Sequence, residues 1–201
     1  MKALAVLPLR TDVVALYVDP RGPYPSRVVE GFDEARDART YAGPLPVVAH
    51  PPCGPWGRLR HLSKHDSPEL AIRAVAQVRA CGGVLEHPRY SLLWEACGMP
   101  KPGELPDAWG GRTIEIAQCD WGHVARKQSW LYIVGGEKLP ETPAHREPTH
   151  WISGGRGREG VKRGTTPVPV GIKVCSAQQR RRTPPAFADW LLELAASARR
   201  P

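Results

Sequence analysis

Short apolar runs alternate along the chain with segments of helical periodicity. The apolar runs are rich in β-branched residues and predict strands at residues 13–18, 46–49, 113–117 and 130–134, and a strand that begins at residues 84–85 and stops at Glu86. A Ser-Pro pair begins a helical pattern at residue 68, and two glycines end it after residue 81. A second helix follows a proline over about 185–197, and Phe187, Trp190, Leu191 and Leu194 share one of its faces.

This alternation of strand, helix and strand predicts an α/β fold, a three-layer sandwich around a mostly parallel, Rossmann-like sheet. The 201 residues fit one compact domain overall. Within it we expect an α/β catalytic core over residues 1–135, a basic, glycine-rich segment over 136–182, and a C-terminal helix over 183–201 that packs back on the core.

Targeting and metal-binding signals are weak in this sequence. The apolar runs are shorter than the roughly 20 residues that a membrane-spanning helix needs, and residues 1–9 lack a signal-peptide cleavage site. The five cysteines are odd in number and irregularly spaced, which favours a reducing, cytoplasmic location. No Cys-x-x-Cys pair is present, so we expect no metal. Cys119 and His123 resemble half of a zinc site, but a buried thiol near a loop histidine explains them more simply.

Positive charge is concentrated in one segment. The formal net charge is +8, and residues 156–182 account for +7 of it, with eight basic residues against the single acid Glu159. The basic residues are Arg156, Arg158, Lys162, Arg163, Lys173, Arg180, Arg181 and Arg182. Such a segment is typical of contact with a polyanion, and we expect it to contact a phosphate backbone. The alternative is a solvated, solubilising loop.

Three predicted strands end in loops that carry reactive side chains. These loops contain Asp19-Pro20-Arg21, His50-Pro51-Pro52-Cys53 and Glu86-His87-Pro88. In parallel sheets, ligands bind beyond the carboxyl ends of the strands. The three loops are therefore expected to form one site.

Cys53 and Glu86 are the candidate catalytic residues of these loops. Two prolines fix the approach to Cys53 and glycines follow it, so its sulfur is a candidate thiolate nucleophile. Glu86 can protonate or hydrogen-bond a heterocycle if burial raises its pKa. The alternatives are a small apolar filler for Cys53 and a capping or salt-bridged carboxylate for Glu86. Arg126 and Lys127, ahead of the last strand, are candidates to hold a phosphate or to anchor Glu86.

The order of these motifs resembles that of the cytosine-C5 DNA methyltransferases. That family carries a Pro-Cys loop, a Glu-Asn-Val loop and a Gln-x-Arg-x-Arg strand. Here the corresponding motifs are Pro52-Cys53, Glu86-His87-Pro88 and Arg126-Lys127-Gln128. The basic segment lies where that family places its target-recognition region, and residues 182–184 loosely match a late motif. The resemblance covers about residues 45–135 and implies a methyltransferase-like sheet, with a histidine at position 87 where the family has asparagine.

The resemblance implies covalent catalysis on a flipped-out pyrimidine in DNA. Cys53 would attack C6 of the base, and Glu86 would be the acid near N3 or O4. The residues that contact the base would be His50, Pro52, Trp56, His87 and Asp19. Trp56, Trp94 and Trp121 are candidates to stack with the base, although core packing is the commoner role of a tryptophan.

The cofactor loop of that family is absent from this sequence. S-adenosylmethionine binds a Phe-x-Gly-x-Gly loop in the family, whereas residues 17–24 here contain two prolines and a single glycine. The pattern therefore looks like that of the phage amino acid:DNA transferases, which replace the pyrophosphate of 5-pyrophosphoryloxymethyl-uracil in DNA with an amino acid. This resemblance implies no cofactor, and double-stranded DNA and a free amino acid as substrates. Arg21, Arg58 and Arg60 would neutralise the pyrophosphate.

Three functions stay open from the sequence. The first is an amino acid:DNA transferase, which if phage-encoded would act in the bacterial host cytoplasm. The second is an S-adenosylmethionine-dependent DNA methyltransferase that acts at C5 or on an exocyclic amine, because residues 50–53 also resemble the Asp-Pro-Pro-Tyr loop of amino-methyltransferases. The third is a DNA-binding or inhibitory protein without catalysis. The sequence predicts no oligomeric state.

Overall fold

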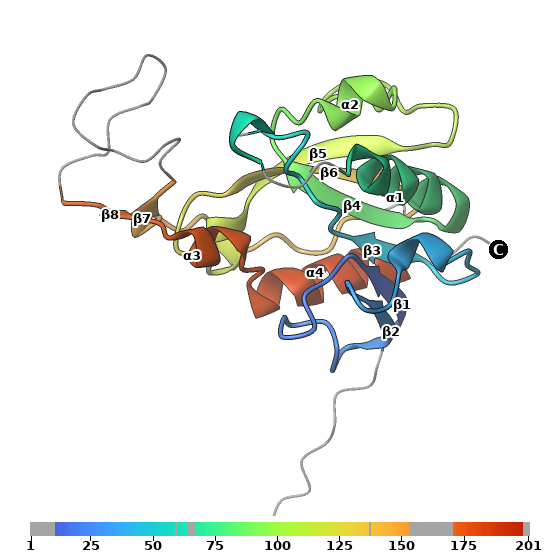
Figure 1. The fold of residues 1–201 in the computed structure, drawn as a ribbon, viewed down its shortest axis with the longest axis horizontal. Helices are drawn as coiled ribbons and strands as arrows, with labels where there is room; N and C mark the ends of the chain where they lie inside the picture. Colours follow the sequence, from blue (N-terminus) through green and yellow to red (C-terminus); the bar gives the residue numbers. More distant parts are fainter. Residues whose placement is uncertain (1–10, 59, 64–66, 137, 153–170, 199–201) are drawn as a thin grey trace, which may run out of the picture.

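Six strands form the central sheet of the computed structural model, which describes residues 11–58, 60–63, 67–136, 138–152 and 171–198 (Figure 1). They lie side by side in the order β2-β1-β3-β4-β6-β5. Their bounds are Thr11–Leu16 (β1), Val28–Phe32 (β2), Val47–Ala49 (β3), Gly83–Pro88 (β4), Arg112–Ala117 (β5) and Gln128–Val134 (β6). The first four strands run parallel, and β6 is antiparallel to both of its neighbours. The predicted α/β fold with a mostly parallel sheet is confirmed at this level.

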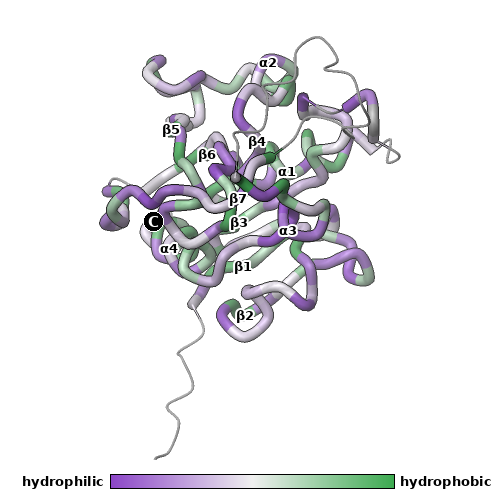
Figure 2. Tube along the Cα trace, turned by 90° about the vertical axis from the view of Figure 1, so that its left-hand side faces the viewer, coloured by the Kyte–Doolittle hydropathy of each residue, from purple (hydrophilic) through white to green (hydrophobic). Residues whose placement is uncertain are grey.

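Helices cover both faces of the sheet (Figure 1). Side chains alternate along each strand, so Val14 and Leu16 of β1 pack with α1 (Pro68–Cys81), while Val13 and Ala15 pack with α4 (Pro185–Ala196). The short helix α2 (Leu93–Ala96) joins α1 on its side. Hydrophobic residues are concentrated in the strands between these two helical layers (Figure 2).

The two predicted long helices are present with the predicted faces. Pro68 begins α1, and the preceding serine takes the N-cap position without a side-chain capping hydrogen bond. The four residues predicted to share one face of α4 are all buried against the sheet. Apolar periodicity was therefore a sufficient signal for both helices.

Several smaller elements were not predicted from the sequence. The edge strand β2 is short and carries a glutamate and a glycine, which weakens its pattern. β1 ends two residues early, because Tyr17 adopts a left-handed φ of 58°. The other elements are η1 (Ala38–Thr40), η2 (Arg60–Leu62), η3 (Gln118–Trp121), β7 (His150–Trp151), β8 (Lys173–Val174) and α3 (Ala177–Arg181).

Gly83 allows β4 to begin where it does. Its φ is 116°, and a Cβ atom at this position would lie 2.0 Å from the carbonyl oxygen of Val47 in β3. Only glycine has both the conformation and the space for this approach. The double glycine that ends α1 in the sequence therefore also starts the strand that carries Glu86.

The basic segment is only partly described. Residues 153–170, with Arg156, Arg158, Lys162 and Arg163, lie outside the described residues, as do residues 1–10 and 199–201. Its described flanks form the two-stranded sheet of β7 and β8 and the helix α3. Among the described residues, no helix has the length and apolar character needed to cross a membrane.

Candidate functional site

Polar side chains from four strands meet at the carboxyl edge of the sheet. His50 directly follows β3, Glu86 lies in the second half of β4, and Gln118 directly follows β5. Ser129 lies at the start of β6, which is antiparallel and therefore begins at this edge. The fold thus brings His50 and Glu86 together, as their positions at strand ends predicted.

Glu86 is the centre of a buried hydrogen-bond network. The residue is 7% exposed. The Nε2 atom of Gln118 donates to Oε1 of Glu86 over 2.9 Å, and the Ser129 hydroxyl donates to the same oxygen. His50 Nδ1 lies 3.1 Å from the other oxygen, Oε2. Both carboxyl oxygens therefore have donors from the protein.

A tyrosine extends this network toward β1. The hydroxyl of Tyr24 lies 2.6 Å from Nε2 of His50, and the tyrosine is buried. Burial, followed by the negative charge of Glu86, raises the pKa of Tyr24 well above its usual value, so its hydroxyl keeps its proton. The hydroxyl can then donate to His50 Nε2 while His50 Nδ1 donates to Glu86. Tyr24, His50 and Glu86 form one hydrogen-bonded chain.

The network keeps Glu86 ionised. Burial by itself raises the pKa of a carboxyl group, but the positive charge of Lys127 and the hydrogen bonds from His50 and Ser129 outweigh it. The pKa of Glu86 is consequently held far below its ordinary value. The expectation that burial raises this pKa is therefore wrong, because a cation and several donors stabilise the charged form.

Cys53 is the exposed member of the five cysteines, in the loop after β3. Partial withdrawal of its sulfur from water raises the pKa of the thiol, and the Glu86 carboxylate raises it further. Lys127 and Arg181 act in the opposite direction without reversing the shift. The prediction of a resting thiolate is therefore wrong. Cys53 and Glu86 do lie within electrostatic reach of each other, as a shared site requires.

His87 lies beneath the loop that carries Cys53. It is 1% exposed, and its Nδ1 lies 2.7 Å from the Ser91 hydroxyl. The Pro52 backbone raises the pKa of the same ring, although no described atom lies in hydrogen-bonding geometry with Nε2. Burial lowers the pKa of His87 to about 4, so the ring is neutral. The structure gives His87 a supporting position under the loop, and its contact with a base stays a prediction.

Two of the predicted phosphate-binding cations influence the Cys53 thiol electrostatically. Lys127, just ahead of β6, acts on both Cys53 and Glu86. Arg181, at the end of α3, acts on Cys53 from the basic segment. Residues distant in the sequence thus both act to lower the pKa of the candidate nucleophile.

Other predicted phosphate-binding residues are exposed and less clearly placed. Arg21 pairs with Asp19 in the loop after β1, where the Asp19 carboxylate accepts from its backbone and side chain. These hydrogen bonds lower the pKa of Asp19. The others, which are exposed or nearly so, are Arg58, Arg60, Arg126, Arg180 and Arg182. No contact in the described structure links Asp19 to the Glu86 network, so its role in base binding stays a prediction.

The tryptophans contribute mainly to the core. Trp94 and Trp121 are buried in the two core clusters. Trp56 is half-buried and packs against the cluster under α1, and its carbonyl accepts a hydrogen bond from Leu92. Trp56 therefore holds the Cys53 loop against the core, and stacking with a base stays a prediction for it.

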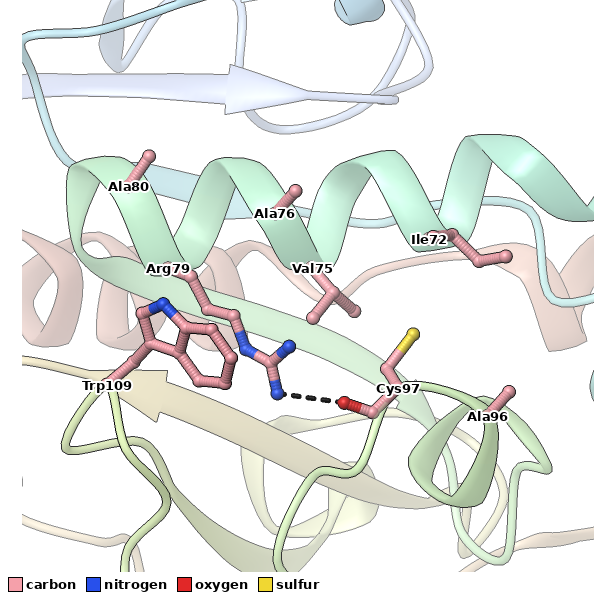
Figure 3. Close-up of a pocket in the computed structure, with 8 residues that line it drawn as sticks. All are labelled: Ile72, Val75, Ala76, Arg79, Ala80, Ala96, Cys97 and Trp109. Carbon is pink, nitrogen blue, oxygen red and sulfur yellow. Dashed lines mark hydrogen bonds between the residues drawn. The ribbon is translucent and has the colours of Figure 1, made fainter.

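An open groove of about 610 Å³ lies on the α1 side of the molecule, away from the Glu86 network (Figure 3). Arg79 crosses it, with its guanidinium 3.8 Å from the centre of the Trp109 ring and a hydrogen bond to the Cys97 carbonyl. Arg79 also pairs with Asp107. This arginine already has its partners and fixes the loop after α2 to α1.

Tyr24, Gln118 and Ser129 belong to the site but were not predicted. Ser129 directly precedes the predicted strand at 130–134, and Gln118 directly follows the predicted strand at 113–117. A search for polar residues at every strand end would have found both. Tyr24 comes from a loop, so only the tertiary structure shows its contact with His50.

Comparison of the chain with protein-family models, curated proteins and solved structures finds no match. The chemistry of the site is therefore argued from its own residues.

Proposed function

We propose that this protein is a DNA base-modifying transferase that acts on a flipped-out pyrimidine. Its preferred reaction replaces the pyrophosphate of 5-pyrophosphoryloxymethyl-uracil with an amino acid through a bond between Cys53 and C6. The observation that carries the proposal is an exposed Cys53, in the loop that follows His50, whose thiol is within the electrostatic influence of the buried, ionised Glu86 and of two cations.

The ionised state of Glu86 favours a uracil-type base over cytosine. N3 of uracil carries a hydrogen and donates, whereas N3 of cytosine accepts and needs a protonated acid. A carboxylate offers about four acceptor positions, and Glu86 Oε1 already receives two donors. Oε2 receives only His50, so one acceptor position stays open for N3–H.

The cations beside Cys53 suit a substrate with a charged leaving group. Lys127 and Arg181 both act on the sulfur electrostatically. Pyrophosphate leaves with several negative charges, and a lysine and an arginine are the side chains that bind phosphate oxygens. The same cations lower the free energy of the enolate that forms when the sulfur adds to C6.

The reaction balances without a methyl donor. The Cys53 thiol loses its proton and adds to C6, which places an electron pair on the C5–C4–O4 enolate. The enolate expels pyrophosphate from the C5 methylene and leaves an exocyclic alkene. The amino group of the amino acid adds to that alkene and releases one proton. The new enolate then expels the thiolate from C6, which restores the 5,6 double bond.

A second candidate is an S-adenosylmethionine-dependent DNA methyltransferase. The sheet order is compatible with it, because an antiparallel strand between two parallel strands near one end resembles the sheets of methyltransferases. This resemblance supports the methyltransferase-like form of the Rossmann-like fold as a scaffold for either reaction. Calorimetric titration with S-adenosylmethionine separates the candidates: tight binding favours the methyltransferase.

The decisive experiment supplies DNA that contains 5-pyrophosphoryloxymethyl-uracil together with a mixture of amino acids. Digestion to nucleosides and mass analysis should show, with the native protein, a 2′-deoxyuridine whose C5 methylene carries an amino acid bound through its amino group. Cys53→Ser should give no product, while Cys97→Ser, which changes a half-buried cysteine elsewhere, should keep it. Full activity of Cys53→Ser overturns the mechanism. Salt-sensitive DNA binding without any new nucleoside supports a non-catalytic DNA-binding protein instead.

A further inference from the structure

A second cluster of reactive side chains lies beyond the end of β5. Cys119 and Asp120 belong to η3, and His145 comes from the extended segment that follows β6. One ligand atom from each lies within 4.8 Å of the other two. Among the described residues, these three side chains form the one such group whose ligand atoms lie close enough together to bind a single ion.

We propose that Cys119, Asp120 and His145 bind a divalent transition-metal ion of the zinc class. A thiolate, a carboxylate and an imidazole are the ligand types that zinc prefers, and three protein ligands leave one position for water. The sequence did not predict this site, because Cys119 was considered only with His123. The His123 ring is already used by the backbone, with Nε2 2.9 Å from the Gln179 carbonyl.

The distances fit a tetrahedral ion. Cys119 Sγ lies 3.6 Å from Asp120 Oδ1. Zinc bonds of about 2.3 Å to sulfur and about 2.1 Å to oxygen, at a tetrahedral angle, require a separation of roughly 3.6 Å. His145 Nδ1 lies 2.9 Å from the same oxygen, and a zinc ion requires roughly 3.4 Å. A movement of about half an ångström by the half-exposed His145 side chain closes this difference.

Charge balance also fits a divalent cation. Cys119 donates a thiol proton to Asp120 Oδ1, and His145 Nδ1 faces that same atom. A divalent ion takes the place of these two protons, so a thiolate, a carboxylate and a neutral imidazole balance its charge. The carboxylate keeps its hydrogen bond from the Arg146 backbone.

The second ring nitrogen of His145, Nε2, faces a carboxylate, which is the partner that metal-bound histidines commonly have. Glu147 Oε1 lies 3.5 Å from His145 Nε2. A carboxylate behind a ligating imidazole orients the ring and makes its nitrogen a better ligand. The Glu147 side chain is 89% exposed, so this support is weaker than in a buried site.

The proposed ion would link His145, in the segment after β6, to Cys119 and Asp120 at the end of β5. That segment leads from β6 to β7 and then to the basic residues beyond position 152. Cys119 directly follows Gln118, which donates to Glu86. An ion at Cys119 would therefore fix the start of the basic segment close to the candidate catalytic site.

The test is titration of the full-length, untagged protein with Co²⁺, followed by competition with Zn²⁺. We expect one ion per chain, a thiolate-to-cobalt charge-transfer band in the near ultraviolet, and visible bands of a tetrahedral ion. Zn²⁺ should remove all of these bands. The cobalt spectrum needs neither DNA nor activity. Metal binding can therefore fail while the proposed function holds, and the proposed function can fail while metal binding holds.

Matched variants separate a built site from adventitious binding. His145→Ala changes a half-exposed side chain, so the fold should survive, and metal affinity should fall at least about tenfold. Cys119→Ser should remove the charge-transfer band. His61→Ala and Cys97→Ser, which change an exposed histidine and a half-buried cysteine elsewhere, should leave binding unchanged. Absence of the band in the native protein, or equal affinity in His145→Ala, overturns the proposal.

Discussion

At the scale of single residues, the site depends on one buried carboxylate whose charge is compensated on every side. Burial of a charge costs several kcal/mol unless donors and cations surround it. Glu86 has donors on both oxygens and Lys127 nearby. Burial of the sulfur, and then the Glu86 charge, raise the pKa of the Cys53 thiol, so it stays protonated in the resting protein. Under the proposed function, substrate binding would bring a partner for Glu86 and place the sulfur against C6 before the thiol is activated.

The pH dependence of Cys53 alkylation tests this electrostatic coupling. Because the pKa of the thiol is raised, iodoacetamide should modify Cys53 more slowly than a free cysteine at pH 7.5, and the rate should increase up to a higher pH. Lys127→Met removes a charge that lowers this pKa, so its alkylation should be slower still at pH 7.5. Intact-mass kinetics measure the rates, with Cys53→Ser as the blank. Faster alkylation of Lys127→Met would contradict the arrangement.

At the scale of elements, β4 connects packing to chemistry. Its first residue approaches β3 so closely that only glycine fits, and its second half supplies both Glu86 and His87. His87 is neutral and buried beneath the loop that carries Cys53. The position of the nucleophile therefore depends on an uncharged imidazole inside the protein.

Acid should destabilise the fold through His87. Its pKa is about 4 in the folded protein and about 6.5 in an unfolded chain, so between these values the unfolded state binds the extra proton. Stability from this residue is therefore present above pH 6.5 and is lost as the pH falls toward 4. Between pH 6.5 and 4.5, urea unfolding should show a loss of about 2 kcal/mol that His87→Gln lacks. Parallel pH profiles of the two proteins would refute this.

At the scale of the whole molecule, positive charge from separate parts of the chain gathers at one edge of the sheet. Lys127 comes from the turn before β6, and Arg181 from the helix that follows the basic segment. Lys138, exposed just after β6, comes from the opposite edge, where the antiparallel strand ends. Under the proposed function, this arrangement predicts that the carboxyl edge of the sheet faces the DNA.

Salt titration of DNA binding tests this orientation. Each phosphate contact contributes about 0.9 to the slope of log K against log salt concentration. Lys127→Met and Arg181→Gln should each reduce the slope by about 1, while Lys138→Gln should leave it unchanged. Fluorescence anisotropy on one duplex measures all four proteins. A reduced slope only for Lys138→Gln would place the DNA at the opposite edge of the sheet and contradict this prediction.

The sequence by itself determined the main strands and the two long helices, and it placed the candidate site at the carboxyl edge of the sheet. Apolar periodicity located α1, α4 and five of the six strands, because these segments bury continuous apolar faces. Polar residues at strand ends located His50, Cys53 and Glu86, because parallel strands deliver their carboxyl ends to one side.

The tertiary structure alone decided the protonation states and the partners. Tyr24 contacts His50 from a loop outside the sheet. Lys127, His50 and Ser129 act on Glu86 from other elements, and their combined effect reverses the direction in which burial shifts the Glu86 pKa. Neither the meeting of Cys119 with His145 nor the approach of Arg181 to Cys53 has a local signal in the sequence. Such contacts depend on distances through space, which local patterns in a chain do not encode.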